Sequence, residues 1–406
     1  MENILNFKNI ILDDIYVNSP VGSRHAALSN NLRGFNIATE GVATVPPNTD
    51  RQGYVFFTRP QLNLTARNCS RHRLMYNLLT YNESSLQTWV RATLDPRLYS
   101  ISSEFARSPM VQNTNPFIPL LTNSIRSLSG APDLIVPIYT SQEGVRKEVH
   151  SMVDGPMEYN QEFDLDATFA NTQDDPISQL FYTWEQYATL VSSDSLNPYM
   201  DMLVENEIDY NTRIYRIVVD KTGKYVSKIA ACGAAIPRSL PTGEFANYNR
   251  ETPVNTSQKD IPIRFNCNGA IYNDPRLMTD FNEVVKIFNP RFRSFVEGNY
   301  SFDSEAKLKR LSNKDSDFFK VNDLDLNRYN YITFPYIDIF TNELMWIVDK
   351  NEANNRISTL DLENDSKLTI GDDFIKEKLK KKAKATIGDD FVQNKLDRAK
   401  RFLNRR

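Results

Sequence analysis

The sequence predicts a mainly β fold with some α-helix, built on an antiparallel sheet with one helix packed against it. Three observations lead to this fold class. A hairpin pattern runs from residue 212 to 231, segments of alternating apolar residues lie on both sides of it, and an amphipathic helix occupies residues 176–191. These periods of two and 3.6 residues separate strand from helix. An N-terminal extension and a C-terminal helical tail are expected around this core.

Residues 1–130 are predicted to be an N-terminal region of short strands and extended loops. Tyr54–Phe57 is an apolar run typical of a buried strand, and Ser84–Ala92 is expected to form a short helix. Prolines interrupt any longer helix. They are Pro46, Pro47, Pro60, Pro96, Pro109, Pro116 and Pro119.

Residues 131–290 are predicted to form a central β-domain that contains the helix. A Pro-rich strand segment, residues 131–140, leads into it. In residues 162–169 apolar side chains alternate with Glu162, Asp164, Asp166 and Thr168, which indicates a strand with an acidic outer face.

The helix of this domain begins at Asp175-Pro176. Asp can cap free amide groups and Pro suits the first helical position. The apolar residues that follow recur at spacings of three and four, which predicts one buried face. They are Ile177, Leu180, Phe181, Trp184, Tyr187, Ala188 and Val191.

The rest of the domain reads as a hairpin and a returning strand. Residues 212–219 and 224–231 are strand-like, and Asp220–Gly223 supplies the turn between them. The prolines of Ile236-Pro237 and Leu240-Pro241 favour an extended passage. Residues 261–267 then alternate apolar and polar, which predicts a strand with one buried face.

This order of elements resembles the tail tube proteins of contractile-tailed bacteriophages, over about a quarter of the chain. The matching residues are Trp184, Tyr215, Ile217, Asp220, Gly223, Ala234, Ala235, Ile236, Pro237, Ile263 and Phe265. The resemblance implies a tube-like β-sandwich or barrel that closes into rings by sheet extension between subunits. Because known tube subunits are much shorter, it favours a specialised relative at the baseplate, the neck or the tube end.

Residues 291–350 are predicted to be an insertion followed by a late hairpin. A helix of residues 277–288 precedes it and should stop at Pro290. Charged, Asn-rich sequence from residue 291 to 327 is expected to be loop. Residues 329–340 and 344–348 are then expected to pair, either on the core sheet or towards a neighbour.

Residues 351–406 are predicted to be a basic helical tail. TIGDDF occurs at Thr369–Phe374 and again at Thr386–Phe391, a repeat of 17 residues in which each copy resembles a helix start. Residues 367–406 contain 13 Lys and Arg against 6 Asp and Glu, a net charge of +7, so the other 366 residues carry −10. Three interpretations stay open: a solvated helix pair, docking on an acidic neighbouring subunit, and binding of packaged DNA.

The sequence predicts no catalytic, cofactor-binding or metal-binding residues. Cys69 and His72 lack the further ligands that a tetrahedral site needs, and His25 and His150 lack the context of a general base. Thr222–Lys224 lacks the rest of a phosphate-binding loop. The carboxylates of Glu162, Asp164 and Asp166 are expected to lie on one solvent-facing side of a strand, for solvation or a subunit contact.

Composition agrees with a folded protein. The 406 residues include 23 Phe and 19 Tyr with only 14 Gly, and the net charge of −3 does not indicate disorder or general nucleic-acid binding. Cys69, Cys232 and Cys267 suggest free thiols in a reducing compartment. No segment is long and apolar enough to indicate a signal peptide or a membrane span.

These observations predict a non-enzymatic structural virion protein of a tailed bacteriophage. It is expected to assemble in the cytoplasm of the bacterial host as a homo-oligomer, by ring and sheet contacts in the tail, the baseplate or the neck. Its expected partners are itself and neighbouring tail proteins, with packaged DNA a possible contact. The alternatives are a phage-encoded enzyme on a β-sandwich and a nucleic-acid-binding virion protein that uses the basic tail.

Overall fold

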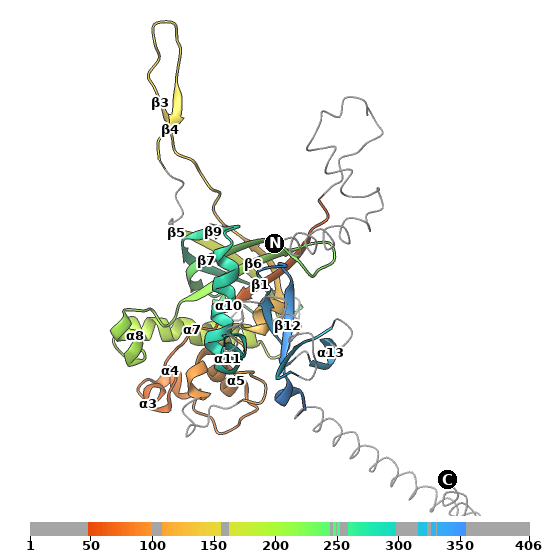
Figure 1. Cartoon of the computed structure of the whole chain (residues 1–406). Helices are drawn as coiled ribbons and strands as arrows, with labels where there is room; N and C mark the ends of the chain where they lie inside the picture. The colour runs from red at the N-terminus through yellow and green to blue at the C-terminus, as the bar shows by residue number, and fades with distance from the viewer. Residues whose placement is uncertain are drawn as a thin grey trace, which may run out of the picture.

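A computed structural model describes residues 48–99, 108–155, 162–243, 247–248, 250–251, 259–297, 316–322, 326–329 and 331–354. The strands in these ranges form three antiparallel sheets (Figure 1). The largest has the order β1-β6-β7-β8-β5-β2, with β9 paired to β7, and a smaller one has the order β10-β12-β11. The third sheet is the hairpin β3–β4. An antiparallel sheet with a packed helix confirms the predicted fold class.

The large sheet consists of β1 (Arg51–Phe57), β2 (Ile125–Ser129), β5 (Glu162–Ala170), β6 (Thr212–Val219), β7 (Val226–Ser239), β8 (Asp260–Asn268) and β9 (Ala270–Tyr272). The other strands are β3 (Ile138–Thr140), β4 (Ser151–Val153), β10 (Phe318–Lys320), β11 (Phe334–Ile337) and β12 (Leu344–Asp349). The described helices are α3 (Ala66–Cys69), α4 (Arg73–Tyr76), α5 (Leu86–Leu94), η1 (Pro96–Tyr99), α6 (Pro119–Ser124), α7 (Pro176–Ser192), α8 (Met200–Glu205), α10 (Arg276–Phe288), α11 (Pro290–Glu297) and α13 (Leu326–Tyr329).

Helix α7 forms the first core together with the large sheet and the N-terminal helices. The Trp184 ring is fully buried, stacks on Phe181 with ring centroids 6.0 Å apart, and donates a hydrogen bond from Nε1 to the Tyr210 carbonyl at 2.8 Å. The predicted stripe is confirmed up to Tyr187. In the last turn Leu190 is buried and Val191 only half-buried, because the buried face continues from Tyr187 by a step of three residues rather than four.

The predicted cap of α7 differs in detail. Asp175 lies in the left-handed region with φ 50°, and its side chain accepts no backbone amide. It instead accepts the Ser178 hydroxyl at 2.7 Å. The positive φ turns the carboxylate away from the first-turn amides. Of the two predicted start signals, only Pro176 in the first helical turn is therefore confirmed.

Strands β6 and β7 are shared between two cores, because successive side chains of a strand point to opposite faces of the sheet. Ile214 and Cys232 belong to the α7 core. Tyr215, Ile217 and Ile229 belong to a second core with α10, α11 and the small sheet. The predicted hairpin is confirmed, with Ile217 opposite Ile229, and β7 continues through the Ile236-Pro237 passage.

The N-terminal region contains more helix than predicted. The strand at residues 54–57 and the helix at residues 84–92 are confirmed as β1 and α5, but α3, α4 and α6 were expected to be loop or strand. Pro119 occupies the first turn of α6, where its missing N–H is tolerated. Strands β1 and β2 belong to the same large sheet as β5, which follows residue 130. The predicted boundary at residue 130 therefore lies between strands of one sheet.

The region after α10 also contains more regular structure than predicted. Helix α10 ends at Phe288 as expected, but Pro290 then begins α11, and Phe292 of that helix is fully buried. Strand β10 lies in the same segment that the sequence predicted to be loop. The late hairpin is confirmed as β11–β12, with Phe334 opposite Ile347, in a sheet of its own. All of the predicted tail after residue 354, including its repeat, lies outside the described residues.

Candidate assembly surfaces

The residues weighed for metal or phosphate chemistry have structural roles. Cys69 is buried in α3, while His72 precedes α4 and its Nδ1 accepts the Leu74 amide at 3.4 Å. Within the described ranges, no group of three or more His, Cys, Asp and Glu residues could hold a metal ion. In the turn at Asp220, the carboxylate accepts the Thr222 hydroxyl at 2.7 Å and the Lys224 amide at 3.2 Å. That segment is a hairpin turn, as predicted.

The three cysteines are buried and form no disulfide. Desolvation by burial raises the pKa of Cys232 to about 11 and that of Cys267 to about 12. At neutral pH both side chains are therefore thiols, which are weak nucleophiles and weak metal ligands compared with thiolates.

The acidic strand face predicted at residues 162–166 exists, but strands β7 and β8 neutralise much of it. The Asp166 carboxylate accepts Arg264 Nε at 2.9 Å, and Asp164 lies 3.4 Å from Arg238. Asp166 and Arg264 lie directly opposite each other on β5 and β8, where opposite charges attract across the sheet. Two carboxylates of this exposed face therefore already have counter-charges, which come from strands far along the sequence.

The hairpin β3–β4 projects away from the rest of the molecule (Figure 1). Ile138 pairs with Val153 and Tyr139 with Met152, and these four side chains are 51–66% exposed. Every residue of both strands is exposed. At its base, the Tyr272 hydroxyl donates a hydrogen bond to the Pro132 carbonyl at 2.6 Å. An isolated two-stranded hairpin is marginally stable in water, so burial against another surface would stabilise this one.

Several further apolar residues of the same projection are exposed, and this concentration distinguishes it from scattered surface apolar residues. They are Leu134, Ile135, Val136, Val145 and Val149. Residues 131–140 were predicted to be strand, but only Ile138–Thr140 form one, and the projection was not predicted. The signal available was the apolar run facing a second short run at residues 151–153 across a charged turn, but that pattern does not tell a buried hairpin from a projecting one.

The two ends of the large sheet differ. At one end, the Tyr54 ring of β1 packs edge-on against Trp346 at 5.7 Å, and Thr58 just beyond β1 bridges to Phe117. At the other end, β2 pairs with β5 on one side and with no other described strand. Arg126 of β2 is held by Asp260 at 3.0 Å. Strand β2 is thus a short edge that another strand could extend.

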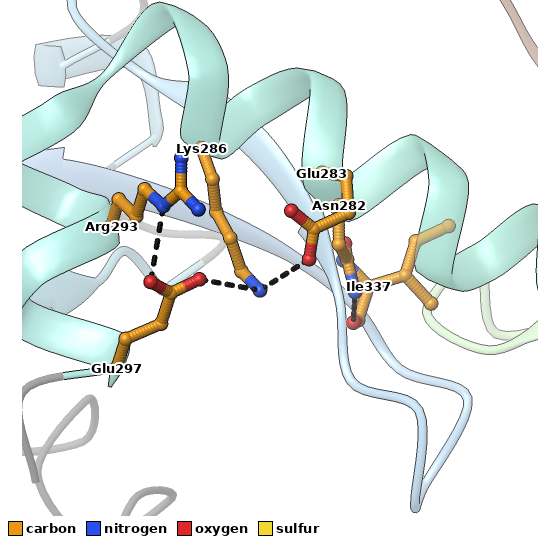
Figure 2. A network of polar contacts seen from close by, with 6 residues as sticks. All are labelled: Asn282, Glu283, Lys286, Arg293, Glu297 and Ile337. Atoms are coloured by element: carbon orange, nitrogen blue, oxygen red, sulfur yellow. Dashed lines mark hydrogen bonds and ion pairs between the residues drawn. The ribbon is translucent and has the colours of Figure 1, made fainter.

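The small C-terminal sheet is fastened to α10 by one amide side chain (Figure 2). The Asn282 Nδ2 donates to the Ile337 carbonyl at 2.6 Å, and the Ile337 amide donates to Asn282 Oδ1 at 2.9 Å. The side chain acts as a neighbouring strand would, and it satisfies both backbone groups at the open edge of β11. On the helix surface nearby, Lys286 lies between Glu283 at 2.7 Å and Glu297 at 3.6 Å. This edge is closed to a partner at Ile337.

A buried polar layer joins the N-terminal helices to the large sheet. The Arg59 guanidinium donates to the Thr93 carbonyl at 2.9 Å and to the Ala92 carbonyl at 2.6 Å, and desolvation lowers its pKa to about 10. Asp95 accepts the Leu64 amide at 2.7 Å and the Tyr199 hydroxyl at 2.8 Å. Desolvation raises the pKa of Asp95 to about 7. These bonds fix the framework that carries the exposed surfaces.

Among the described residues, no helix has the length and apolar character to cross a bilayer.

Among the solved structures that the chain is similar to are three proteins of contractile injection systems. The anti-feeding prophage cap (AFP tube terminating cap) is 12% identical, with 39% of this chain and 81% of that chain covered and a TM-score of 0.24. A chain of the PVC sheath-tube complex in the extended state is 14% identical, with 39% of this chain and 82% of that chain covered and a TM-score of 0.24. A chain of the PVC sheath/tube terminator in the extended state is 12% identical, with 39% of this chain and 87% of that chain covered and a TM-score of 0.22.

A search of curated proteins finds no match to the chain. A family model does match it, over residues 4–363, which is most of its length. That family is described as "Putative phage tail tube protein". The match includes the large sheet, α7, the projecting hairpin and the C-terminal sheet. The chain therefore belongs to this family of phage tail tube proteins, as its resemblance to tail tube proteins predicted.

Proposed function

We propose that this protein is a non-enzymatic structural subunit of a phage tail, which assembles with copies of itself through the hairpin β3–β4 and the edge strand β2. The family match supports a structural tail protein. The observation that carries the assembly mode is the hairpin, whose strands are exposed along their whole length and rich in apolar side chains. Residence in the virion and assembly in the host cytoplasm are parts of this proposal.

The hairpin presents two faces to a neighbouring subunit. Ile138 and Val153 form one apolar cross-strand pair, and Tyr139 and Met152 form the other apolar pair. Side chains alternate along a strand, so the two pairs point in opposite directions. A partner that covers only one face would depend on one pair, and a hairpin inserted between two copies would depend on both.

Edge strand β2 offers a second contact. Its backbone N–H and C=O groups on the side away from β5 are available for main-chain hydrogen bonds to another strand. Sheet extension there would join subunits side by side, while the hairpin reaches further out. The position in the tail, whether tube, tube end, baseplate or neck, and the division at residues 130, 290 and 350 stay predictions.

Substitution of one hairpin face tests the proposal. Thr keeps strand propensity while removing apolar surface, so Ile138→Thr with Val153→Thr should leave the hairpin formed. Burial of a side chain of this size contributes about 1.5–3 kcal/mol. Losing part of it at two positions should weaken association on the order of tenfold or more, since about 1.4 kcal/mol corresponds to a factor of ten.

The measurement is the oligomer distribution of the purified full chain by light scattering and negative-stain electron microscopy. The matched control is Ile287→Thr, which changes an exposed apolar residue on α10 that is 60% accessible. We expect the parent and the control to form rings or stacked oligomers and the hairpin variant to shift to smaller species. A parent that stays monomeric, or a hairpin variant that assembles like the parent, would reject the proposal.

A further inference from the structure

Helix α8 carries an apolar face with no partner in the described structure. Met200, Leu203, Val204 and Ile208 are between 49% and 74% exposed. The first three follow the spacing of three and four residues that places them on one side of α8, and Ile208 follows the end of the helix. Met202, on the opposite side, is buried. The helix lies at the periphery of the molecule in Figure 1. We call these four residues, together with Glu205 and Glu207, the α8 patch.

The segment that leads into α8 is held firmly on the N-terminal helices, so exposure of the patch is not a sign of a loose loop. The Tyr199 hydroxyl donates to Asp95 Oδ2 at 2.8 Å, and Arg97 lies 5.0 Å over the Tyr199 ring. The Asn197 carbonyl accepts Nδ2 groups from Asn63 and Asn68, both at 2.9 Å. The fold therefore presents the apolar face on a fixed platform.

The segment that carries the patch is acidic, with three Asp and Glu and no Lys or Arg in residues 200–208. Asp201 of α8 is paired with Arg97. Glu205 and Glu207 are exposed and form no ion pair with any residue that the structure describes. A ligand for this patch should therefore combine apolar side chains with positive charge.

The chain contains a segment with that chemistry. Residues 367–406 carry a net charge of +7, and apolar residues recur between the basic ones. They include Phe374, Ile375, Leu379, Phe391, Val392, Leu396 and Phe402. The described fold ends at residue 354, and the 12 residues 355–366 can span about 40 Å when extended. The basic segment can thus reach well beyond the point where the described chain ends.

We propose that the α8 patch binds residues 367–406 of this same chain, either within one molecule or from a neighbouring copy. The other acidic face considered, on β5, is less suitable because Arg238 and Arg264 already neutralise it. Contact with α8 buries apolar residues on both sides and brings Glu205 and Glu207 near Lys and Arg. Exposed ion pairs are weak singly and are screened by salt, so the apolar contact supplies most of the affinity. This inference does not depend on the hairpin or on ring formation.

Hydrogen exchange of the full-length protein tests the contact. We expect the backbone amides of residues 374–402 to exchange at least tenfold more slowly in the parent than in Leu203→Gln with Val204→Gln. Gln removes the apolar surface without disfavouring the helix. Glu205→Lys with Glu207→Lys, and 0.5 M NaCl on the parent, should each speed exchange of the same amides by a smaller factor. The matched control Ile287→Gln on α10 should leave these amides unchanged.

A photo-cross-linking residue at position 204 of the full chain identifies the occupant directly. Cross-linked peptides from residues 367–406 would support the proposal, and their appearance within monomers or between copies would tell the two arrangements apart. Cross-links to the hairpin of residues 132–155, to another protein only, or to nothing would overturn it. Equal exchange of the 374–402 amides in the parent and in the Leu203/Val204 variant would overturn it as well.

Discussion

Asn282 should hold the C-terminal sheet on α10 through both polar atoms of its amide. The side chain is 1% exposed and satisfies the N–H and the C=O of Ile337. Asn282→Ala leaves both backbone groups buried without partners. Each unsatisfied group costs about 1–3 kcal/mol, so we expect the free energy of unfolding to fall by about 2–5 kcal/mol.

In Asn282→Asp the stability of this contact should depend on pH. A protonated carboxyl group has one acceptor and one donor, so it can replace the amide, whereas a carboxylate faces the Ile337 carbonyl with no hydrogen to donate. The folded-state pKa of the introduced carboxyl group should therefore lie above its unfolded value of about 3.9. The variant should approach the parent's stability below about pH 4 and lose stability as the pH rises through the folded pKa.

The assay is urea unfolding followed by tryptophan fluorescence, with hydrogen exchange of β11 and β12 to localise the effect. Glu283→Ala is the matched control, because it lies next to Asn282 on α10 and removes a surface ion pair with Lys286. We expect that control to stay within about 0.5 kcal/mol of the parent. Two results would contradict the proposed role of Asn282. One is an Asn282→Ala variant that unfolds like the parent. The other is a loss of unfolding free energy in Asn282→Asp that is the same at pH 4 and pH 7.

Two further predictions concern the α7 core and the buried polar layer. Trp184→Ala should lower the free energy of unfolding by about 3–5 kcal/mol, because a fully buried ring is removed. Trp184→Phe should lower it less. A Trp184→Ala variant that unfolds in urea like the parent would show that the apolar stripe of α7 does not form a core. The pKa of Asp95 is about 7 when folded, above its unfolded value of about 3.9, so its contribution to stability is full below pH 4 and is lost as the pH rises towards 7. Asp95→Asn should therefore gain stability relative to the parent between pH 4 and 7, and a constant difference in urea unfolding over that range would contradict the assigned pKa.

Local sequence patterns were enough to locate most of the central elements. The stripe through Trp184 predicted α7, the alternation at residues 162–169 and 261–267 predicted β5 and β8, and Asp220–Gly223 predicted the turn between β6 and β7. Periodicity of this kind depends only on residues within a few positions of each other. The resemblance based on those elements also pointed to the family that the match over residues 4–363 confirms.

The tertiary structure decided which faces are covered and by what. Asp166 pairs with Arg264, which is 98 positions away in the sequence, and Asn282 binds the backbone of Ile337, which is 55 positions away. Neither pairing follows from local spacing, because it depends on strand register and on the path of the chain between elements. The same holds for the exposure of the hairpin at residues 138–153 and of the α8 patch. An apolar run in the sequence identifies side chains that are more stable when buried. Only the fold shows whether other parts of the same chain bury them.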